Sequence, residues 1–232
     1  MPDFRPANSH GSIDEVFPDV FFVTGRFGFA PLLTITRNMT IVRQKDELVV
    51  INSVRLDDSG EKELEKLGKV KHVIRTGFFH GVDDPYFKHR YGAKMWAAPA
   101  QVSKSGDGYE ALDTKNSPLE GAQIFSFENG KEPEVAVLLE KEGGILVPCD
   151  SYQNWTTFEG CSFLGGLMMR AMGFGPTLVG GPWVKRMGQN VKADFGRLKE
   201  TPFKHLVPAH GTVIKNDAKE GLLKAIAHRF PG

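Results

Sequence analysis

Two segments in the second half of the chain, Gly143-Gly-Ile-Leu-Val-Pro-Cys-Asp150 and His205-Leu-Val-Pro-Ala-His-Gly211, decide the fold. Each is a short apolar run of strand character, and each is followed by a side chain that is able to bind a metal, Asp150 or His210. In α/β folds, ligands bind beyond the carboxyl ends of the strands. The two segments therefore predict strands whose ends form part of a functional site.

The first half of the chain contains a strand–helix–strand pattern. Residues 47–52 form a continuous apolar run, residues 57–67 follow a helical period, and residues 69–76 form a second apolar run. Such a crossover places its two strands side by side and parallel. The loop Thr76-Gly-Phe-Phe-His-Gly-Val-Asp-Asp84 then lies at a strand's carboxyl end, and we expect it at the same edge as the two segments above.

Each half of the chain begins with antiparallel strands and continues into helices. Residues 16–23 and 33–43 predict an opening antiparallel pair, and residues 123–147 predict a meander of three strands. No linker divides residues 1–232. We therefore expect one domain of the α/β class, an αββα sandwich in which two mixed β-sheets lie face to face with helices on both outer faces.

Three segments have local patterns of their own. Residues 103–119 are rich in Ser, Gly, Asp, Asn and Pro and predict a surface loop. Residues 185–199 carry apolar side chains at spacings of three and four and predict one helix. Residues 173–183 hold four glycines and two prolines and are interpreted either as an irregular connection or as a mobile flap over the site.

Composition excludes several classes of function. The chain has 232 residues, of which 41% are hydrophobic and 25% charged, with a formal net charge of +1, so a dedicated nucleic-acid binder is not expected. Two cysteines without a Cys-x-x-Cys pair indicate neither a disulfide framework nor a zinc knuckle. No signal-like or membrane-spanning run is present, which predicts a cytoplasmic protein without a membrane partner. The chain also lacks Gly-x-Ser-x-Gly and P-loop motifs.

The order of these strand-end motifs resembles the metallo-β-lactamase fold superfamily from Phe17 to His228. In that family the loop after a Thr-ending strand carries His-x-His-x-Asp-His, and a further His precedes the aspartate strand. The strand-end Asp and the His of a Pro-x-His-Gly segment complete a centre of one or two metals. By this resemblance Asp150 matches the bridging aspartate and His210 the final histidine.

The first motif departs from the family pattern. With Thr76 as the anchor, Gly77, Phe79, Gly81 and Val82 stand where ligands are expected, and His80 lies one place after the second histidine. The third histidine is absent, because residues 90–204 contain no His and residues 130–135 read Gly-Lys-Glu-Pro-Glu-Val. The resemblance therefore implies a centre of at most one metal.

The remaining candidates define a hydrolytic hypothesis. His80, Asp150 and His210 would be the ligands of one Zn or Fe ion, since two imidazoles and one carboxylate are found in open zinc and ferrous sites. Asp84 or Asp83 would act as the base or as a further ligand. The resemblance then implies hydrolysis of an ester, a thioester or a lactone, with a small molecule as substrate.

The sequence leaves several alternatives open. Asp150 and His210 also suit local capping and turn roles, and Asp83 and Asp84 before Pro85 suit a helix N-terminus. The rival function is a metal-free binding or interaction module, its pocket lined by aromatic side chains: Phe78, Phe79, Trp155 and Trp183. A dioxygenase or other redox role with iron is a third. The Met-rich residues 163–172 suit a core helix and are also compatible with a homo-oligomer contact.

Overall fold

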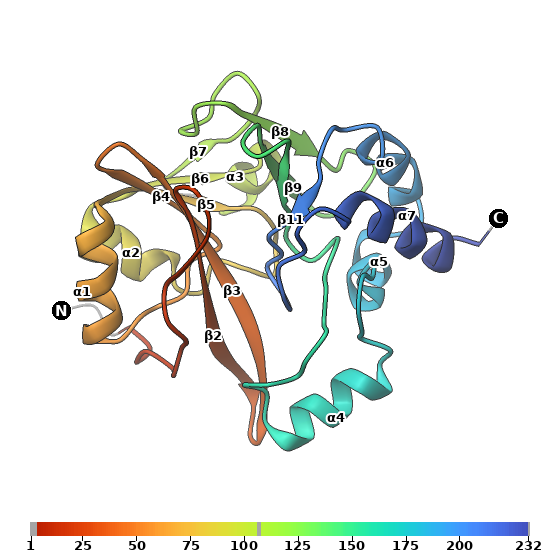
Figure 1. Ribbon diagram of the computed structural model, residues 1–232, viewed down its shortest axis with the longest axis horizontal. Helices are drawn as coiled ribbons and strands as arrows, with labels where there is room; N and C mark the ends of the chain where they lie inside the picture. Colours follow the sequence, from red (N-terminus) through yellow and green to blue (C-terminus); the bar gives the residue numbers. More distant parts are fainter. Residues whose placement is uncertain (1–3, 106–107, 232) are drawn as a thin grey trace.

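The larger of two β-sheets occupies the N-terminal half of the protein (Figure 1). The structure is a computed structural model that describes residues 4–105 and 108–231. The sheet has seven strands in sequential order: β1 (Asp14–Phe17), β2 (Val20–Ala30), β3 (Leu33–Gln44), β4 (Glu47–Ile51), β5 (Lys69–Arg75), β6 (Lys94–Ala97) and β7 (Tyr109–Ala111). Strands β1 to β4 pair antiparallel, and β4 to β7 pair parallel. The parallel crossover expected from the sequence is therefore confirmed.

The second sheet has four strands in the order β11-β10-β9-β8. These strands are β8 (Ala122–Ser126), β9 (Val135–Leu139), β10 (Ile145–Val147) and β11 (His205–Leu206). Strands β8, β9 and β10 form the expected antiparallel meander, and β11 pairs parallel to β10. Strands β10 and β11 come from residues 143–150 and 205–211 and pair parallel, so their carboxyl ends meet at one edge.

Helices cover the outer face of each sheet, as Figure 1 shows. The described helices are α1 (Asp58–Leu67), α2 (Asp84–Tyr91), α3 (Pro99–Ser105), α4 (Phe163–Ala171), α5 (Gly181–Met187), α6 (Val191–Leu198) and α7 (Ala218–Arg229). Side chains of α1 and α2 pack with the first sheet, and those of α5, α6 and α7 pack with the second. The αββα sandwich expected from the sequence is confirmed.

Alternation along the buried strands divides the core into layers. In β4, Val49 and Ile51 face the space between the sheets, whereas Leu48 and Val50 face the helices. In β9, Val137 lies between the sheets and Leu138 faces α5 to α7. Because a strand exposes successive side chains on opposite faces, these all-apolar runs are buried on both sides.

Two expectations about local structure were wrong. Residues 103–119 are not all loop, because α3 reaches Ser105 and β7 pairs with β6. Residues 185–199 form two helices rather than one. Helix α5 ends before Gly188, whose φ of 90° is incompatible with a continuing helix, and α6 begins at Val191.

Among the described helices, none combines the length and the apolar character needed to cross a bilayer.

Candidate metal centre

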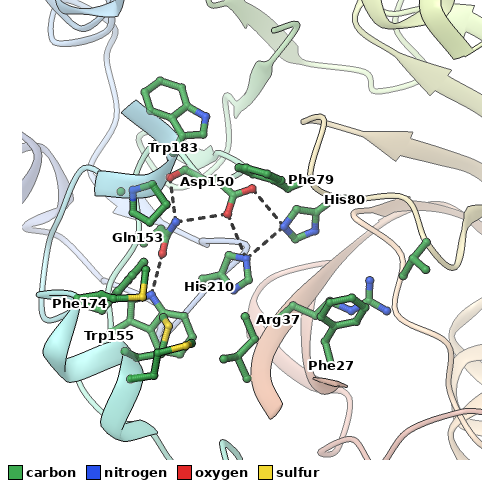
Figure 2. Close-up of a pocket in the computed structure, with 17 residues that line it drawn as sticks. Phe27, Arg37, Phe79, His80, Asp150, Gln153, Trp155, Phe174, Trp183 and His210 are labelled. Atoms are coloured by element: carbon green, nitrogen blue, oxygen red, sulfur yellow. Dashed lines mark hydrogen bonds and ion pairs between the residues drawn. The ribbon is translucent and has the colours of Figure 1, made fainter. Parts of the chain in front are cut away.

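Three side chains from three separate loops meet at the edge where the strands end (Figure 2). His80 lies in the loop after β5, Asp150 follows β10, and His210 follows β11. The Nε2 atoms of His80 and His210 are 3.2 Å apart. Oδ2 of Asp150 lies 3.5 Å from Nε2 of His80, and Oδ1 lies 3.2 Å from Nε2 of His210. The structure thus brings together all three residues that the sequence predicted as ligands.

These separations suit a single metal ion. Zinc binds imidazole nitrogen and carboxylate oxygen at about 2.0–2.2 Å with tetrahedral geometry, so its ligand atoms lie about 3.3–3.5 Å from one another. The two nitrogens and the carboxylate oxygens have this spacing, and all three side chains are buried. The facing atoms of the three side chains therefore have the spacing that one small divalent cation requires, with the two contacts of Asp150 made by different oxygens.

The orientation of His210 is fixed from outside the centre. Its Nδ1 lies 2.8 Å from the carbonyl oxygen of Thr36, and because a carbonyl only accepts, Nδ1 carries the hydrogen. In a neutral ring Nε2 then presents a lone pair to the Asp150 carboxylate, an arrangement that needs a proton or a cation between them. Metal-ligating histidines usually donate their second ring N–H to a carbonyl or carboxylate in this way.

The turn that carries His210 is clamped by β3. The Nδ2 of Asn38 donates to the carbonyl oxygens of Pro208 and Gly211 at 3.0 and 2.8 Å, and its backbone N donates to Ala209 at 2.8 Å. The ring of Trp155 stacks on the imidazole, with centroids 5.6 Å apart and 18° between the planes. The sequence also allowed His210 to act only by stabilising its own turn. Its contacts with Thr36 and Trp155 lie outside that turn.

The loop of His80 is held by its neighbours in the sheet. Asn52, at the end of β4, accepts hydrogen bonds from the backbone N and the hydroxyl of Thr76 at 3.1 and 2.8 Å. Arg75 donates to the carbonyl oxygens of Gly77 and Phe78 at 3.1 and 2.8 Å. These bonds curl the loop so that His80, rather than a residue at 77 or 79, reaches the centre.

The space of the missing first ligand is filled by other side chains. A Cβ at Gly77 would lie 2.5 Å from Sγ of Cys149 and 2.8 Å from Oε2 of Glu134. Glu134 is buried at the start of β9, where it accepts hydrogen bonds from Nε1 of Trp183 at 2.7 Å and from the backbone N of Ser151 at 3.1 Å. A histidine at position 77 is therefore excluded by packing, and residues 130–135 supply a carboxyl group where the family pattern has a histidine.

Cys149, which no sequence motif marked as a ligand, forms with His80 and Asp150 a group of possible ligand atoms that all lie within 4.8 Å of one another. Its thiol donates to Oδ2 of Asp150 at 3.4 Å. Burial, together with the Asp150 and Glu134 carboxyls, raises the pKa of this thiol well above its usual range, so it is protonated at neutral pH. A metal would have to displace that proton to recruit Cys149 as a further ligand.

Charge at the centre is unbalanced. Burial lowers the pKa of His80 to about 3, which keeps the ring neutral at pH 7. Burial by itself raises the pKa of Asp150, but the charge that His80 gains at the acidic pH where this carboxyl titrates, together with the contact to His210, holds it at about 2, so the carboxylate is ionised at pH 7. A buried carboxylate beside a neutral imidazole is an environment that favours a cation.

The neutral His80 predicts how stability depends on pH in chelator-treated protein. Because the pKa falls from 6.5 to about 3 on folding, this stabilisation is complete above pH 6.5 and is lost as the pH drops toward 3. Burial raises the pKa values of Glu134 and Asp84, so these two groups make the protein more stable as the pH falls, opposite to His80. Asp150 changes the pH dependence of stability only below its usual pKa of 3.8. The informative quantity is therefore the difference between wild type and His80→Gln.

We expect wild type to lose roughly 2 kcal/mol of unfolding free energy relative to His80→Gln between pH 7.5 and pH 5.0. Urea denaturation of both proteins in chelator at the two pH values measures this difference. Parallel pH profiles for the two proteins would contradict it.

Asp83 and Asp84 lie outside the pocket that the three ligand candidates line. Asp83 pairs with Arg37 and accepts a hydrogen bond from the backbone N of Arg55 at 2.8 Å. Asp84 accepts from Ser53 Oγ at 2.6 Å and from the Tyr109 hydroxyl at 2.8 Å. Their expected role as base stays a prediction, and the contacts they make position the loop of His80 instead.

The helix-start interpretation of the same two residues describes the backbone. Helix α2 begins at Asp84 with Asp83 at the N-cap position and Pro85 in its first turn. The Asp83 side chain makes no capping bond, because it is engaged by Arg37 and Arg55.

A pocket of about 430 Å³ opens beside the centre. It is lined mainly by apolar side chains, which lie on more than one side of the candidate ligands (Figure 2). Three of the four aromatic residues proposed for the binding module, Phe79, Trp155 and Trp183, line this pocket. Phe78 does not, since it packs against the core between the second sheet and its helices.

The segment 173–183 borders the pocket and is tied to the loop after Asp150. Leu178 and Gln153 exchange two backbone hydrogen bonds at 2.9 and 3.0 Å, and the backbone N of Trp155 donates to Gly175 at 3.0 Å. Trp183, at the end of the segment, already belongs to α5 and is buried. Movement of this segment as a flap stays a prediction.

Comparison with known proteins identifies the fold. No protein-family model and no curated protein matches the sequence. Among solved structures, VMB-1 aligns with a TM-score of 0.68 at 14% identity, covering 94% of this chain and 97% of its own. The metallo-β-lactamase FIM-1 from Pseudomonas aeruginosa, in its mono-zinc form, aligns with a TM-score of 0.63 at 13% identity, with 98% and 99% covered.

A metallo-β-lactamase from Pontibacter korlensis gives a TM-score of 0.62 at 16% identity, with 93% and 98% covered. The chain therefore has the metallo-β-lactamase fold over nearly its whole length, as the strand-end motifs implied.

Sequence reasoning missed three residues that shape the centre. Cys149 stands directly before Asp150, and its adjacency to a predicted ligand was the available signal. Gln153 donates to the backbone oxygen of Asp150 at 2.9 Å and accepts from Nε1 of Trp155 at 2.7 Å. Arg37 comes from β3, far from the motifs, and nothing in the sequence placed it at the pocket.

Proposed function

We propose that this protein is a metal-dependent hydrolase of an ester, a thioester or a lactone, with one divalent metal held by His80, Asp150 and His210. The observation that carries the proposal is the spacing of 3.2–3.5 Å among the facing atoms of these three side chains. Two imidazoles and one carboxylate suit zinc and also ferrous iron. The mono-zinc form of FIM-1, a protein of the same fold, favours zinc.

A zinc ion held there would supply Lewis acidity and activate water for attack on a carbonyl carbon. The chain's own residues contribute position and environment. Thr36 and Trp155 fix the His210 ring, and Gln153 holds the loop of Asp150. Asp150 is the only carboxylate among the described pocket-lining residues, and both of its oxygens face the two imidazoles, so it serves as a ligand and supplies the negative charge of the centre.

The apolar wall contributes to the same chemistry. Trp155, Phe174 and the methionines of α4 surround the open side of the centre and limit access of bulk water. A lower local dielectric strengthens the interaction of any cation with a developing negative charge on the substrate. The pocket is thus suited to a substrate with a carbonyl group at one end and an apolar remainder.

Metal content and hydrolysis test the proposal together. Protein purified without chelator is analysed for zinc and iron, and is then assayed with aryl esters, acyl thioesters and lactones before and after chelation. We expect about one zinc per chain and an activity that chelation removes and zinc restores. Absence of stoichiometric metal, or hydrolysis that chelation leaves unchanged, would contradict it.

The rival is a binding module without metal, and the aromatic and methionine wall of the pocket favours it. It predicts ligand binding that neither chelation nor loss of His210 alters. Stoichiometric iron with oxygen-dependent turnover would instead point to the redox alternative.

A further inference from the structure

The pocket beside the centre has a polar patch in a lining that is otherwise mainly apolar. His80, Asp150 and His210 form this patch, and apolar side chains lie on more than one side of it (Figure 2). Phe27 and Ile35 belong to the β2–β3 hairpin, whereas the facing wall consists of Met168, Met169, Met172 and Phe174 on and after α4. A volume of about 430 Å³ is in the range of small-molecule sites.

Most polar atoms of the wall have partners, whereas Nε of Arg37 is buried with no hydrogen-bond partner among the described residues. Gln153 donates to Asp150 and accepts from Trp155, so its amide is occupied within the wall. Arg37 pairs with Asp83, and its guanidinium lies over the Phe27 ring, 5.1 Å from the centroid. A ligand in the outer part of the pocket therefore meets mainly hydrocarbon, sulfur and aromatic surface.

Part of the pocket's apolar lining is exposed to solvent. Phe79, Met172 and Val82 line the pocket and are 57%, 49% and 40% exposed. Exposed apolar side chains beside a cavity mark a surface that gains from being covered. Methionines on one wall allow that surface to adapt to flexible ligands, because the thioether side chain is unbranched and polarizable.

Helix α4 is held against the hairpin at its first turn. The hydroxyl of Ser162 caps the helix by accepting from Gly165 N at 3.1 Å, and it donates to the carbonyl of Leu32 at 2.7 Å. The backbone N of Ser162 donates to Thr34 at 3.0 Å. The two walls of the pocket are thereby fixed to each other, and the space between them is a built feature of the fold.

We propose that the substrate carries an unbranched apolar chain that lies between α4 and the β2–β3 hairpin, with its carbonyl group beside His80, Asp150 and His210. The chain site rests on the pocket alone. Only the identity of the reacting end rests on the proposed hydrolytic function.

Methyl ketones test the chain site without any reaction, since a ketone has no leaving group to hydrolyse. Dissociation constants of 2-pentanone to 2-nonanone are measured by titration calorimetry, once with zinc present and once in chelator. Burial of each added methylene is expected to tighten binding about fourfold until the pocket is filled. The same dependence is expected in both conditions, because the chain does not contact the metal.

A matched pair of variants on α4 localises the effect. Met168 is half-buried and lines the pocket, whereas its neighbour Leu167 is 53% exposed and does not line it. We expect Met168→Gln to weaken binding of 2-nonanone at least about fivefold and Leu167→Gln to change it less than about twofold. Circular dichroism and thermal melts confirm that both variants are folded.

The outcomes separate the two proposals. Affinity independent of chain length, or equal effects of the two variants, would overturn the chain site even if the protein proves to be a zinc hydrolase. A chain-length dependence in protein that holds no metal and hydrolyses nothing would support the chain site and sink the proposed hydrolysis.

Discussion

Replacing Asp150 with alanine is expected to abolish zinc binding and to lower hydrolytic kcat/KM at least about 10³-fold. Asp150 faces both imidazoles at 3.2 and 3.5 Å, so its loss removes the only charged member of the donor set. A Lewis acid contributes several kcal/mol to carbonyl hydrolysis, and each 1.36 kcal/mol is a factor of ten in rate. Elemental analysis and steady-state kinetics at fixed zinc concentration measure the two effects.

Asp150→Asn is the isosteric companion of this change. It keeps the shape of the side chain and removes the charge, so we expect the metal to be lost while the chelated protein unfolds at a similar urea concentration. His210→Ala is expected to act in the same direction, because it removes a second donor. Asp46→Ala is the matched control, since Asp46 forms an exposed pair with Lys69 on the surface.

Zinc content that survives both Asp150 and His210 substitutions would contradict the assigned ligands. An equal loss of metal from the Asp46 variant would show that metal is lost during purification and not because a ligand was removed. Activity that persists without metal would leave the pocket as a binding site, as in the metal-free alternative.

Strand-end motifs carried enough information to place two residues of the centre. The runs before Cys149-Asp150 and Ala209-His210 are apolar, whereas the run before Thr76 has charged or polar side chains between Val70, Val73 and Ile74. Strands β10 and β11 are parallel neighbours, so the carboxyl ends that carry Asp150 and His210 lie together. Strand β5 belongs to the other sheet, and its end meets the second sheet where the backbone N of Val135 donates to Thr76 O at 2.8 Å. The grouping of Asp150 with His210 therefore follows from strand pairing, whereas the place of His80 depends on how the two sheets pack.

The local environment of the centre depends on contacts that no pattern encodes. Glu134 fills the space beside Gly77 from a different sheet, and Arg37 reaches Asp83 across 46 positions of sequence. Asp83-Asp84 before a proline correctly predicts a helix start. The partners of the two carboxylates are not predictable from that pattern, because they come from β3, β7 and the residues after β4. The break between α5 and α6 had a local signal in Gly188, which apolar periodicity outweighed.

The altered first motif, residues 76–84, and the apolar pocket are structurally connected. Glu134 and Cys149 occupy the volume beside Gly77, so the centre retains only donors that face outward toward the pocket. A centre of this kind exposes one side of the metal position to substrate and packs the other side against the core. Selectivity for the substrate would then come mainly from the wall of α4 and the hairpin rather than from a second metal.

Gly211→Ala is expected to cost about 2–5 kcal/mol of unfolding free energy and to weaken zinc binding at the same time. Gly211 has a φ of +85°, and a Cβ there would lie 1.9 Å from the carbonyl oxygen of Asn154. A left-handed backbone costs a side-chain-bearing residue about 1–2 kcal/mol, and backbone shifts that relieve a collision cost about 1–3 kcal/mol more. Since domains are stable by about 5–15 kcal/mol, the loss is a large share of the total.

The effect on zinc follows from the hydrogen bonds around the same glycine. Gly211 O accepts from Asn38 at 2.8 Å, and the backbone N of Asn154 donates to His210 O at 3.3 Å, so a displaced turn moves the imidazole away from Asp150. Gly121→Ala is the matched control, because Gly121 has a φ of +62° and a Cβ there meets open space. It should cost only the backbone strain of about 1–2 kcal/mol and leave zinc affinity unchanged. Urea denaturation in chelator measures the loss of stability, and competition with a zinc chelator measures zinc affinity. Equal losses for Gly211→Ala and Gly121→Ala would show that the close packing of Gly211 against Asn154 does not position the His210 turn.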